Sequence, residues 1–399
     1  MNLIDKTHYD FDQIIDRRSS LSLKWNRYDQ DVLPMWVADM DFVSPQPVLD
    51  ALQKQIDHGI FGYPSEINKS SEELSELIQA IINRMDSRYQ WQVQPEEILL
   101  IPGVVPGFNL ACHALVAPQE EVLIQTPVYS PILNAADHTH IQKREMELTH
   151  LPDGSYAFNE HDFEDAITSQ TRLFILCNPH NPVGKVFSRS ELALMAETCL
   201  RHGITICSDE IHSDLVFPGN QHIPIACLDP EVAQKTITLI APSKTYNIAG
   251  LQCSVAIIQN QELKKKFLDS RRGLLPWVNL MGLVASRAAY MYGDNWLKQL
   301  MQYLEANRDF LVNYVNSEFP GVKVWSPQGT YLAWLDCRAA GLHTSPYKFF
   351  LEQARVACND GATFGQAGSG FVRFNFGCPK STLEEALSRM RNALNAVHG

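Results

Sequence analysis

The chain has 399 residues, of which 45% are hydrophobic, and a formal net charge of -12 at pH 7. This length allows about two to three domain-sized units with buried cores. The acidic balance, without a long basic stretch, disfavours nucleic acid or an anionic membrane as a partner, and no apolar run is long enough to span a membrane.

The first 44 residues begin with a polar and aromatic stretch of little periodicity, which suggests an N-terminal arm. The apolar segment from Val32 to Phe42 then predicts a short strand that ends in two carboxylates. Pro45 and Pro47 begin a predicted helix. The Ser-Ser-Glu-Glu sequence at 70–73 predicts the capped start of a second helix, which continues to residue 85.

From residue 97 onward, short and wholly apolar runs alternate with helical patterns. Such strands, separated by helices, predict an α/β fold with a mostly parallel sheet that is covered on both faces. Ligands of these sheets bind outside the carboxyl ends of the strands, so the residues that follow each run are the candidates for a site. The predicted strands are Ile98–Ile101, Val122–Gln125, Leu173–Cys177, Ile204–Ser208, Ile237–Ile240 and Cys253–Ile258.

After residue 279 the pattern shifts to long helices, short strands and a final helix. This order predicts a smaller α+β domain, which the N-terminal segment joins. We therefore expect a large domain of residues 45–285 and a small domain made of residues 1–44 and 286–399.

The nine cysteines include no Cys-x-x-Cys pair, and several lie in apolar runs where a thiol is usually core filler. An odd count without a disulfide framework suits a reducing cytoplasm. The N-terminus lacks the charged and apolar regions of a secretory signal. His138 and His140 have no cluster of cysteines or carboxylates beside them, so we expect no metal site.

Lys244 directly follows the apolar run at 236–240 and the strand-ending Pro242. Burial lowers the pKa of a lysine, and a neutral amine can attack a carbonyl group to form an imine. The commoner alternative is a solvated surface lysine. What favours the imine is the set of residues at the other strand ends.

Four other strand ends carry polar or aromatic candidates. The glycine turn at 102–107 precedes a helix, which would direct free N–H groups toward a phosphate. Tyr129 is suited to stacking on a flat ring, although packing against the sheet is the commoner fate of an aromatic residue. Asn181 lies in a rigid loop with two Asn-Pro dipeptides, and Asp209 ends a buried run. A buried carboxylate must be protonated or paired, and a pyridinium nitrogen is one such partner, whereas capping of the next turn is the alternative.

Arg373 alternates with apolar residues along the predicted strand 371–376, so it can point inward. No carboxylate is near it in the sequence. It is therefore a candidate for two-pronged binding of a substrate carboxylate, with a structural ion pair as the alternative.

In chain order these residues form the inventory of a pyridoxal-phosphate site: phosphate turn, stacking aromatic, Asn, Asp, Lys and Arg. The order and spacing resemble fold-type-I pyridoxal-phosphate enzymes, the aspartate-aminotransferase-like superfamily, over nearly the whole chain. Within that superfamily the chain looks most like cystathionine β-lyases of the MalY/PatB type. The motifs that carry the resemblance are LPMWVADMDF (33–42), FGYP (61–64), GVVP (103–106), TPVY (126–129), NPHNPVG (178–184), SDEIH (208–212), SKTYNIAG (243–250) and RFNFGCP (373–379).

The resemblance implies a seven-stranded, mostly parallel sheet between helices, a smaller α+β domain, and a role for each site residue. Around the ring of the cofactor, pyridoxal 5'-phosphate, the implied roles are imine formation and proton transfer for Lys244, pairing with the pyridinium nitrogen for Asp209, binding of the phenolic oxygen for Asn181 with His212 nearby, and stacking for Tyr129. The implied phosphate ligands are the backbone of Val104 and Val105, together with Ser243 and with Tyr63 from a second subunit. The implied substrate ligands are Arg373 and the backbone of Ala38. The chain departs from aminotransferases at Gln252, where those enzymes usually carry a cation, and at Ala241, where they usually carry a serine.

The implied reaction is α,β-elimination from a sulfur amino acid, which yields a thiol, pyruvate and ammonia. Lys244 acts as the general base, and the departing thiolate takes its proton from Lys244 or from a tyrosine, for which Tyr63 and Tyr129 are the candidates. Transamination is the alternative reaction, because it shares the first steps. Another alternative is that the main function is a MalY-like regulatory interaction, with lyase activity only as a residual property. The Tyr63 contribution implies a homodimer.

Overall fold

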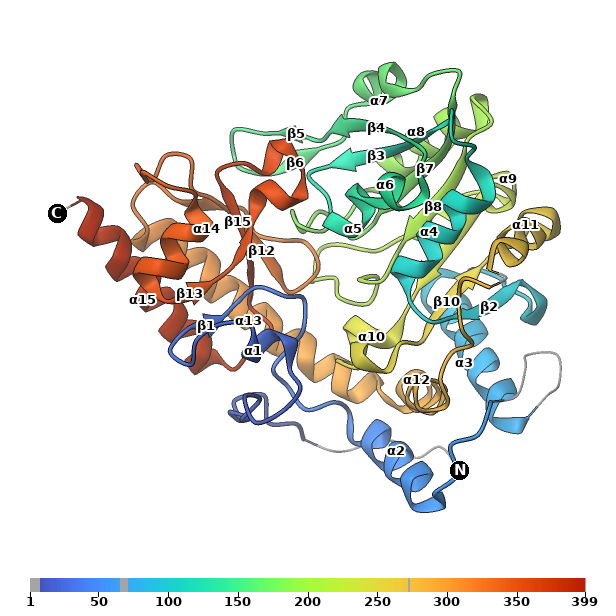
Figure 1. Cartoon of the computed structure of the whole chain (residues 1–399), viewed down its shortest axis with the longest axis horizontal. Coiled ribbons are helices and arrows are strands. Elements are labelled where there is room, and N and C mark those ends of the chain that lie inside the picture. Colours follow the sequence, from blue (N-terminus) through green and yellow to red (C-terminus); the bar gives the residue numbers. More distant parts are fainter. Residues whose placement is uncertain (1–7, 65–70, 272, 399) are drawn as a thin grey trace.

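The computed structural model describes residues 8–64, 71–271 and 273–398, and a seven-stranded sheet is its largest element (Figure 1). The strand order is β2-β10-β9-β8-β7-β3-β4. Strand β10 runs antiparallel to both of its neighbours, whereas the other six strands share one direction. In chain order the strands are β2 (Ile98–Ile101), β3 (Glu121–Thr126), β4 (Gln142–Glu147), β7 (Thr171–Cys177), β8 (Thr205–Asp209), β9 (Thr236–Ile240) and β10 (Ser254–Ile257).

Helices cover both faces of this sheet, which explains why its inner strands are apolar along their length. In β2, Leu99 and Ile101 belong to one buried cluster, and Ile98 and Leu100 belong to another on the opposite face. One face is covered by α4 (Val104–Leu115), α6 (Ala135–Thr139) and α11 (Gln261–Arg271). The other is covered by α7 (Glu160–Ala166), α8 (Arg189–Arg201) and α9 (Pro230–Gln234), and near β2 by α3 (Glu72–Tyr89) and α12 (Leu280–Tyr292).

A second, four-stranded sheet of order β11-β12-β15-β14 is formed by the C-terminal part of the chain. Its strands are β11 (Lys323–Val324), β12 (Leu332–Asp336), β14 (Asn359–Asp360) and β15 (Phe371–Asn375). The long helices α13 (Asp294–Glu318) and α15 (Lys380–His398) pack against each other. Leu383, Leu387, Met390 and Leu394 of α15 are fully buried at the three- and four-residue spacing of one helix face.

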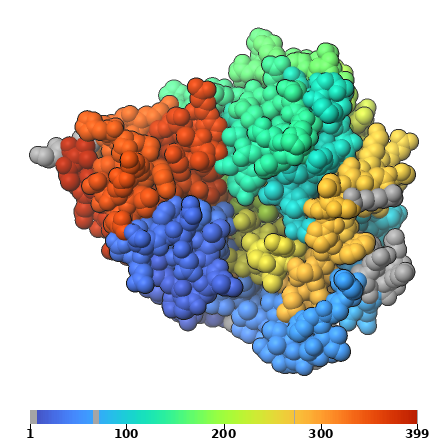
Figure 2. All heavy atoms as spheres, in the orientation of Figure 1, coloured from blue at the N-terminus to red at the C-terminus, as the bar shows by residue number. Residues whose placement is uncertain are grey.

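The N-terminal segment packs onto this C-terminal part, as the blue and orange atoms show in Figure 2. The predicted strand from Val32 to Phe42 is wrong in extent. Only β1 (Leu33–Pro34) is a strand, and it pairs with β13 (Val356–Ala357). From Trp36 onward, side chains instead bind backbone carbonyl oxygens of this segment, among them those of Trp36, Val37 and Asp39, and no ladder continues.

Helix α2 (Gln46–His58) follows this segment and packs against α12. Its N-terminal prolines agree with the expected start. Helix α3 begins at the expected position, where the Ser71 hydroxyl accepts a hydrogen bond from the Leu74 N–H at 3.3 Å. Ser70 lies outside the described residues.

Strand β4 was not predicted. It is the edge strand of the large sheet, and of its six side chains only Met146 is buried. An edge strand with polar side chains gives no apolar signal in the sequence. No helix within the described ranges is long and apolar enough to cross a membrane. The division of the chain into domains at residues 45 and 285 stays a prediction.

Candidate active site

A cavity of about 270 Å³ lies where five strands of the large sheet reach their carboxyl ends. Residues that follow β2, β3, β7, β8 and β9 line it, together with Ala38 from the N-terminal segment and Arg373 from β15. The cavity brings together every predicted site residue except Tyr63: Ala38, Val104, Val105, Tyr129, Asn181, Asp209, His212, Ser243, Lys244 and Arg373. Sequence positions more than three hundred residues apart therefore meet in one cavity.

Lys244 lies on α10 (Pro242–Thr245), the single helical turn that follows β9. Its Nζ donates a hydrogen bond to the carbonyl oxygen of Ala38 at 2.6 Å. Burial lowers the pKa of Lys244 to about 8; the carboxylates of Asp39 and Asp209 oppose this shift, and the charge of Arg373 adds to it. A substantial fraction of this amine is therefore neutral near physiological pH, as a nucleophile or general base requires.

Asp209 is the last residue of β8 and is 4% exposed. One carboxylate oxygen, Oδ1, accepts a hydrogen bond from the Ile211 N–H at 3.1 Å. Burial raises the pKa of Asp209 to about 7, and among the described residues no cation forms an ion pair with it. The carboxylate is thus placed to accept a cationic ligand atom.

His212 lies three residues beyond Asp209 and is almost fully buried. Its Nδ1 atom has no hydrogen-bond partner among the described residues. Burial lowers the pKa of His212 to about 3, and the charges of Lys244 and Arg373 lower it further, so the imidazole is neutral at pH 7. A buried ring nitrogen without a partner at the cavity wall is ready to bind a ligand.

Arg373 is 3% exposed, as its alternation with apolar residues on β15 predicts. The guanidinium donates from Nη1 to the Asn181 side-chain oxygen at 2.9 Å and from Nη2 to Asn359 Oδ1 at 2.6 Å. Nη2 also donates to the backbone oxygen of Trp36 at 3.1 Å, whereas Nε is buried without a partner among the described residues. All of these partners are neutral, so the alternative of a structural ion pair finds no support in the described part of the chain. Burial lowers the pKa of Arg373 to about 10, and the group stays a cation at pH 7.

Tyr129 and Asn181 lie on neighbouring loops. The Tyr129 N–H donates a hydrogen bond to the backbone oxygen of Asn181 at 3.0 Å. Because Asn181 Oδ1 already accepts from Arg373, the amide nitrogen is the atom left to donate to a ligand oxygen. Tyr129 is half-buried, and burial raises the pKa of its hydroxyl.

The start of α4 forms another part of the cavity wall. The helix runs for 12 residues from Val104, so the N–H groups of Val104 and Val105 have no partner within it. A helix N-terminus of this length favours an anion. A Cβ atom on Gly103 would lie 3.1 Å from Pro106 Cδ, so the turn is closely packed.

One polar residue of the cavity wall was not predicted from the sequence. Ser254, the first residue of β10, lines the cavity beside Gln252. A polar residue at the start of an otherwise apolar strand was the available signal. Gln252 lines the cavity, whereas Ala241 is buried and does not line it.

A network of buried contacts fixes the N-terminal segment that presents Ala38. Asn375 donates from Nδ2 to the backbone oxygens of Val37 at 2.7 Å and Asp39 at 2.9 Å. Lys24, which is fully buried, binds Asp41 Oδ2 at 2.7 Å and the backbone oxygen of Asp39 at 2.9 Å. Arg17 binds the side-chain carboxylates of both Asp39 and Asp41 at 2.7 Å, so these two carboxylates are structural anchors for the segment whose Ala38 carbonyl meets Lys244.

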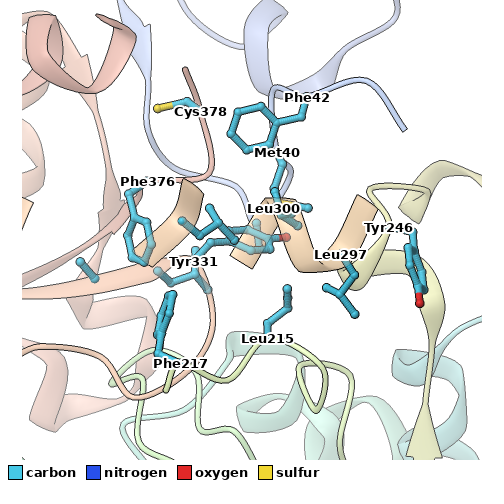
Figure 3. Packing of buried hydrophobic residues seen from close by; sticks show 14 of the residues in the cluster. Met40, Phe42, Leu215, Phe217, Tyr246, Leu297, Leu300, Tyr331, Phe376 and Cys378 are labelled. Atoms are coloured by element: carbon cyan, nitrogen blue, oxygen red, sulfur yellow. The ribbon is translucent and has the colours of Figure 1, made fainter. Parts of the chain in front are cut away.

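Apolar contacts reinforce these anchors. Figure 3 shows Met40 and Phe42 of the N-terminal segment close to Leu300 of α13, with Tyr331 and Phe376 beside them. Tyr331 directly precedes β12, and Phe376 directly follows β15. One buried cluster thus joins the N-terminal segment to the C-terminal part of the chain.

On the other side of α10, Thr245 donates from Oγ1 to Asp214 Oδ2 at 3.1 Å. Asp214 is held by Arg84 at 2.7 Å and Arg88 at 2.9 Å. Burial would raise the pKa of Asp214, but these two arginines outweigh it and the pKa is lowered. The turn that carries Lys244 is thereby tied to α3.

Tyr63 lies outside this cavity. It is 99% exposed and borders a groove of about 510 Å³ between α2, α3 and α12. Ile56, Ile60 and Phe61, near Tyr63 in sequence, are more than half exposed. Within one protomer, Tyr63 therefore contributes nothing to the candidate site.

The cavity residues fit a flat heteroaromatic aldehyde that carries a phosphate. The unpaired Asp209 carboxylate suits a protonated ring nitrogen, the orphaned His212 nitrogen suits a ring substituent, and the α4 N-terminus suits the phosphate. Lys244 supplies the amine that such an aldehyde requires. These are the groups needed to hold pyridoxal 5'-phosphate.

Comparison with known proteins agrees with this chemistry. The chain belongs to the aminotransferase class I and II family, whose model matches residues 30–390. It is 39% identical to cystathionine β-lyase PatB of Bacillus subtilis over 96% of this chain and 100% of that protein. It is 32% identical to the protein MalY of Escherichia coli, over 98% of this chain and 100% of that protein.

A solved structure extends the likeness to three dimensions. Cystalysin from Treponema denticola, which contains pyridoxal 5'-phosphate, matches with a TM-score of 0.93 at 32% identity, over 98% of this chain and 100% of that chain. The predicted fold, fold type I of the pyridoxal-phosphate enzymes, and the predicted resemblance to cystathionine β-lyases are both confirmed.

Proposed function

We propose that this protein is a pyridoxal-phosphate-dependent carbon–sulfur lyase that acts on a β-thio-substituted amino acid. With one water molecule, the substrate yields a free thiol, pyruvate and ammonium. The observation that carries the proposal is that one cavity holds the lowered-pKa amine of Lys244, the carboxylate of Asp209 and the cation of Arg373. Within the described part of the chain, neither Asp209 nor Arg373 has an ion-pair partner. The relatives named cystathionine β-lyase support the lyase reaction over transamination.

Each group has a distinct task in this proposal. Arg373 binds the substrate carboxylate, since its charge has no carboxylate partner among the described residues. Asp209 keeps the proton on the cofactor's ring nitrogen, and Asn181 donates to the phenolic oxygen. The α4 N-terminus, with Ser243 and Ser254, holds the phosphate. Bound pyridoxal phosphate supplies an electron sink for the charge left on the substrate's α-carbon.

Lys244 is the proton carrier of the reaction. Its amine would hold the cofactor, and its Nζ would remove the α-proton of the bound substrate. Its contact with the Ala38 carbonyl holds that nitrogen at the cavity wall. Tyr129 lines the same cavity, which supports it as the donor of a proton to the departing sulfur. Tyr63 of a second subunit is the competing donor.

The proposed working form is a homodimer in the cytoplasm. The exposed apolar residues around Tyr63 support an interface with a second copy, which would bring Tyr63 to the partner's cavity. All nine cysteines are free thiols, which supports a reducing compartment. The division into domains of 45–285 and 1–44 plus 286–399 belongs to the same proposal.

The test uses purified protein loaded with pyridoxal phosphate. We expect cystathionine or cystine to release thiol and pyruvate without any keto acid, and Lys244→Ala to abolish both this release and the borohydride-sensitive visible absorption band. A requirement for a keto acid, with accumulation of pyridoxamine phosphate, would show a transaminase instead. No bound cofactor at all would refute the assignment of the site.

A further inference from the structure

Two loops carry the residues that would contact the face and the phenolic oxygen of the cofactor ring. Residues 127–129 follow β3 and end in Tyr129, and residues 178–184 follow β7 and include Asn181. They are joined by the bond from the Tyr129 N–H to the Asn181 carbonyl oxygen. The side chain of His180 makes a second connection between them.

His180 is fully buried, and both of its ring nitrogens face backbone carbonyl oxygens. Nε2 lies 2.8 Å from the oxygen of Pro127, on the neighbouring loop, and Nδ1 lies 3.2 Å from the oxygen of Cys177, at the end of β7. The backbone of His180 is held within its own loop, because its N–H donates to Lys185 and its carbonyl accepts from Gly184. The ring therefore leaves its own loop to reach Pro127.

The protonation state follows from these contacts. Carbonyl oxygens only accept, and a neutral imidazole has a single N–H. Burial lowers the pKa of His180 to about 4, so the ring is neutral at pH 7. Of the two ring nitrogens, Nε2 makes the shorter contact, and we place the proton on it. Nε2–H then donates a hydrogen bond to the Pro127 oxygen, and this bond connects the two loops.

We infer that His180 is a positioning residue, whose Nε2–H bond to Pro127 sets the distance between Tyr129 and Asn181 in the cofactor site. Pro127 lies two residues before Tyr129, and Asn181 directly follows His180. Through Asn181, the same link reaches the guanidinium of Arg373. The ring thus couples the aromatic group, the amide and the substrate cation without lining the cavity itself.

This inference rests on the proposed function, because its readout is bound pyridoxal phosphate. Two variants separate the two ring nitrogens. His180→Gln keeps a donor near the Nε2 position, whereas His180→Asn keeps one only near the Nδ1 position. Thr139→Val is the matched control: it removes a buried bond of 2.8 Å from a threonine hydroxyl to the Ala135 oxygen, away from the cavity.

We expect His180→Asn to weaken pyridoxal-phosphate binding by about five- to a hundredfold, since the buried Pro127 oxygen loses its partner. Its visible circular dichroism band should change, and kcat should fall more than KM rises. His180→Gln should restore the band and most of the affinity. Thr139→Val should lower thermal stability alone.

Equal effects of His180→Asn and Thr139→Val on stability, with an unchanged cofactor band, would overturn the inference and leave the lyase proposal intact. A His180→Gln variant as defective as His180→Asn would also overturn it, because the Nε2 donor would then not be the important group. Failure of the unmodified protein to bind pyridoxal phosphate would instead refute the proposed function.

Discussion

The amine of Lys244 donates a hydrogen bond to the carbonyl oxygen of Ala38 across 206 positions of sequence. The carbonyl belongs to a segment that Asn375, Lys24 and Arg17 hold in place. The lysine therefore has a fixed position before any ligand is bound, at a site whose surroundings favour the neutral amine. This arrangement leads to the first of four predictions.

The stability of the cofactor-free protein should depend on pH through Lys244. Its folded-state pKa of about 8 lies below the usual 10.5, so between these values the unfolded chain binds more protons than the folded one. Stability then rises with pH across that window. Relative to Lys244→Met, the unmodified protein should gain up to about 3 kcal/mol between pH 8 and 10.5. Urea unfolding of both proteins at several pH values measures this difference, and parallel curves would contradict it.

Replacing Arg373 by Lys should raise KM for the amino-acid substrate and lower kcat/KM about a hundredfold or more, because lysine keeps the charge but loses the two-pronged geometry. Steady-state kinetics on the holoenzyme provide the measurement. Arg338→Lys is the control, since Arg338 binds Asp336 at the surface with a side chain that is 52% exposed. An unaffected KM in Arg373→Lys would assign the carboxylate to another group.

Asp41→Asn should destabilise the fold by about 3–5 kcal/mol, since the fully buried Lys24 would lose its anionic partner. Denaturant unfolding measures the loss. Asp57→Asn, which alters an exposed side-chain bond to Gln53, should change stability little. Comparable stability of the two variants would mean that Lys24 finds another partner.

Mixing two inactive variants tests whether Tyr63 acts across a dimer. If Tyr63 serves the partner's site, a mixed dimer of Tyr63→Ala and Lys244→Ala has one site with both defects and one with neither. Random exchange should then restore about a quarter of the unmodified activity. The purified variants are mixed, allowed to exchange subunits and then assayed for pyruvate. Continued inactivity, with exchange verified, would exclude the contribution in trans.

The sequence was most informative where one physical effect dominated. The inner strands could be predicted because a sheet covered on both faces demands apolar side chains, and the site could be predicted because those strands end at one edge. Strand β4 could not, since an edge strand can be polar. The segment from Val32 to Phe42 is apolar, and this pattern predicted a strand. Its apolar residues instead pack in a core, mostly without belonging to a ladder.

The partners of the site residues were harder to predict than the residues themselves. Asn375 lies two positions after Arg373, on the same face of β15, and this spacing was an available signal for its importance. Trp36 binds Arg373 only because the fold brings distant segments together, and Asn359 binds it because β14 pairs with β15. No local pattern marks such a contact. The same holds for Lys24, whose burial is visible only in three dimensions.

The bonds from Asn375 to the backbone around Ala38 span 338 and 336 positions of sequence. During synthesis, the segment that meets Lys244 leaves the ribosome after Arg17 and Lys24 but long before Asn375 exists. The nascent chain can thus build its large sheet early, but it has no finished pocket until residue 375 has emerged. Binding of the cofactor is accordingly one of the last events in the maturation of this protein.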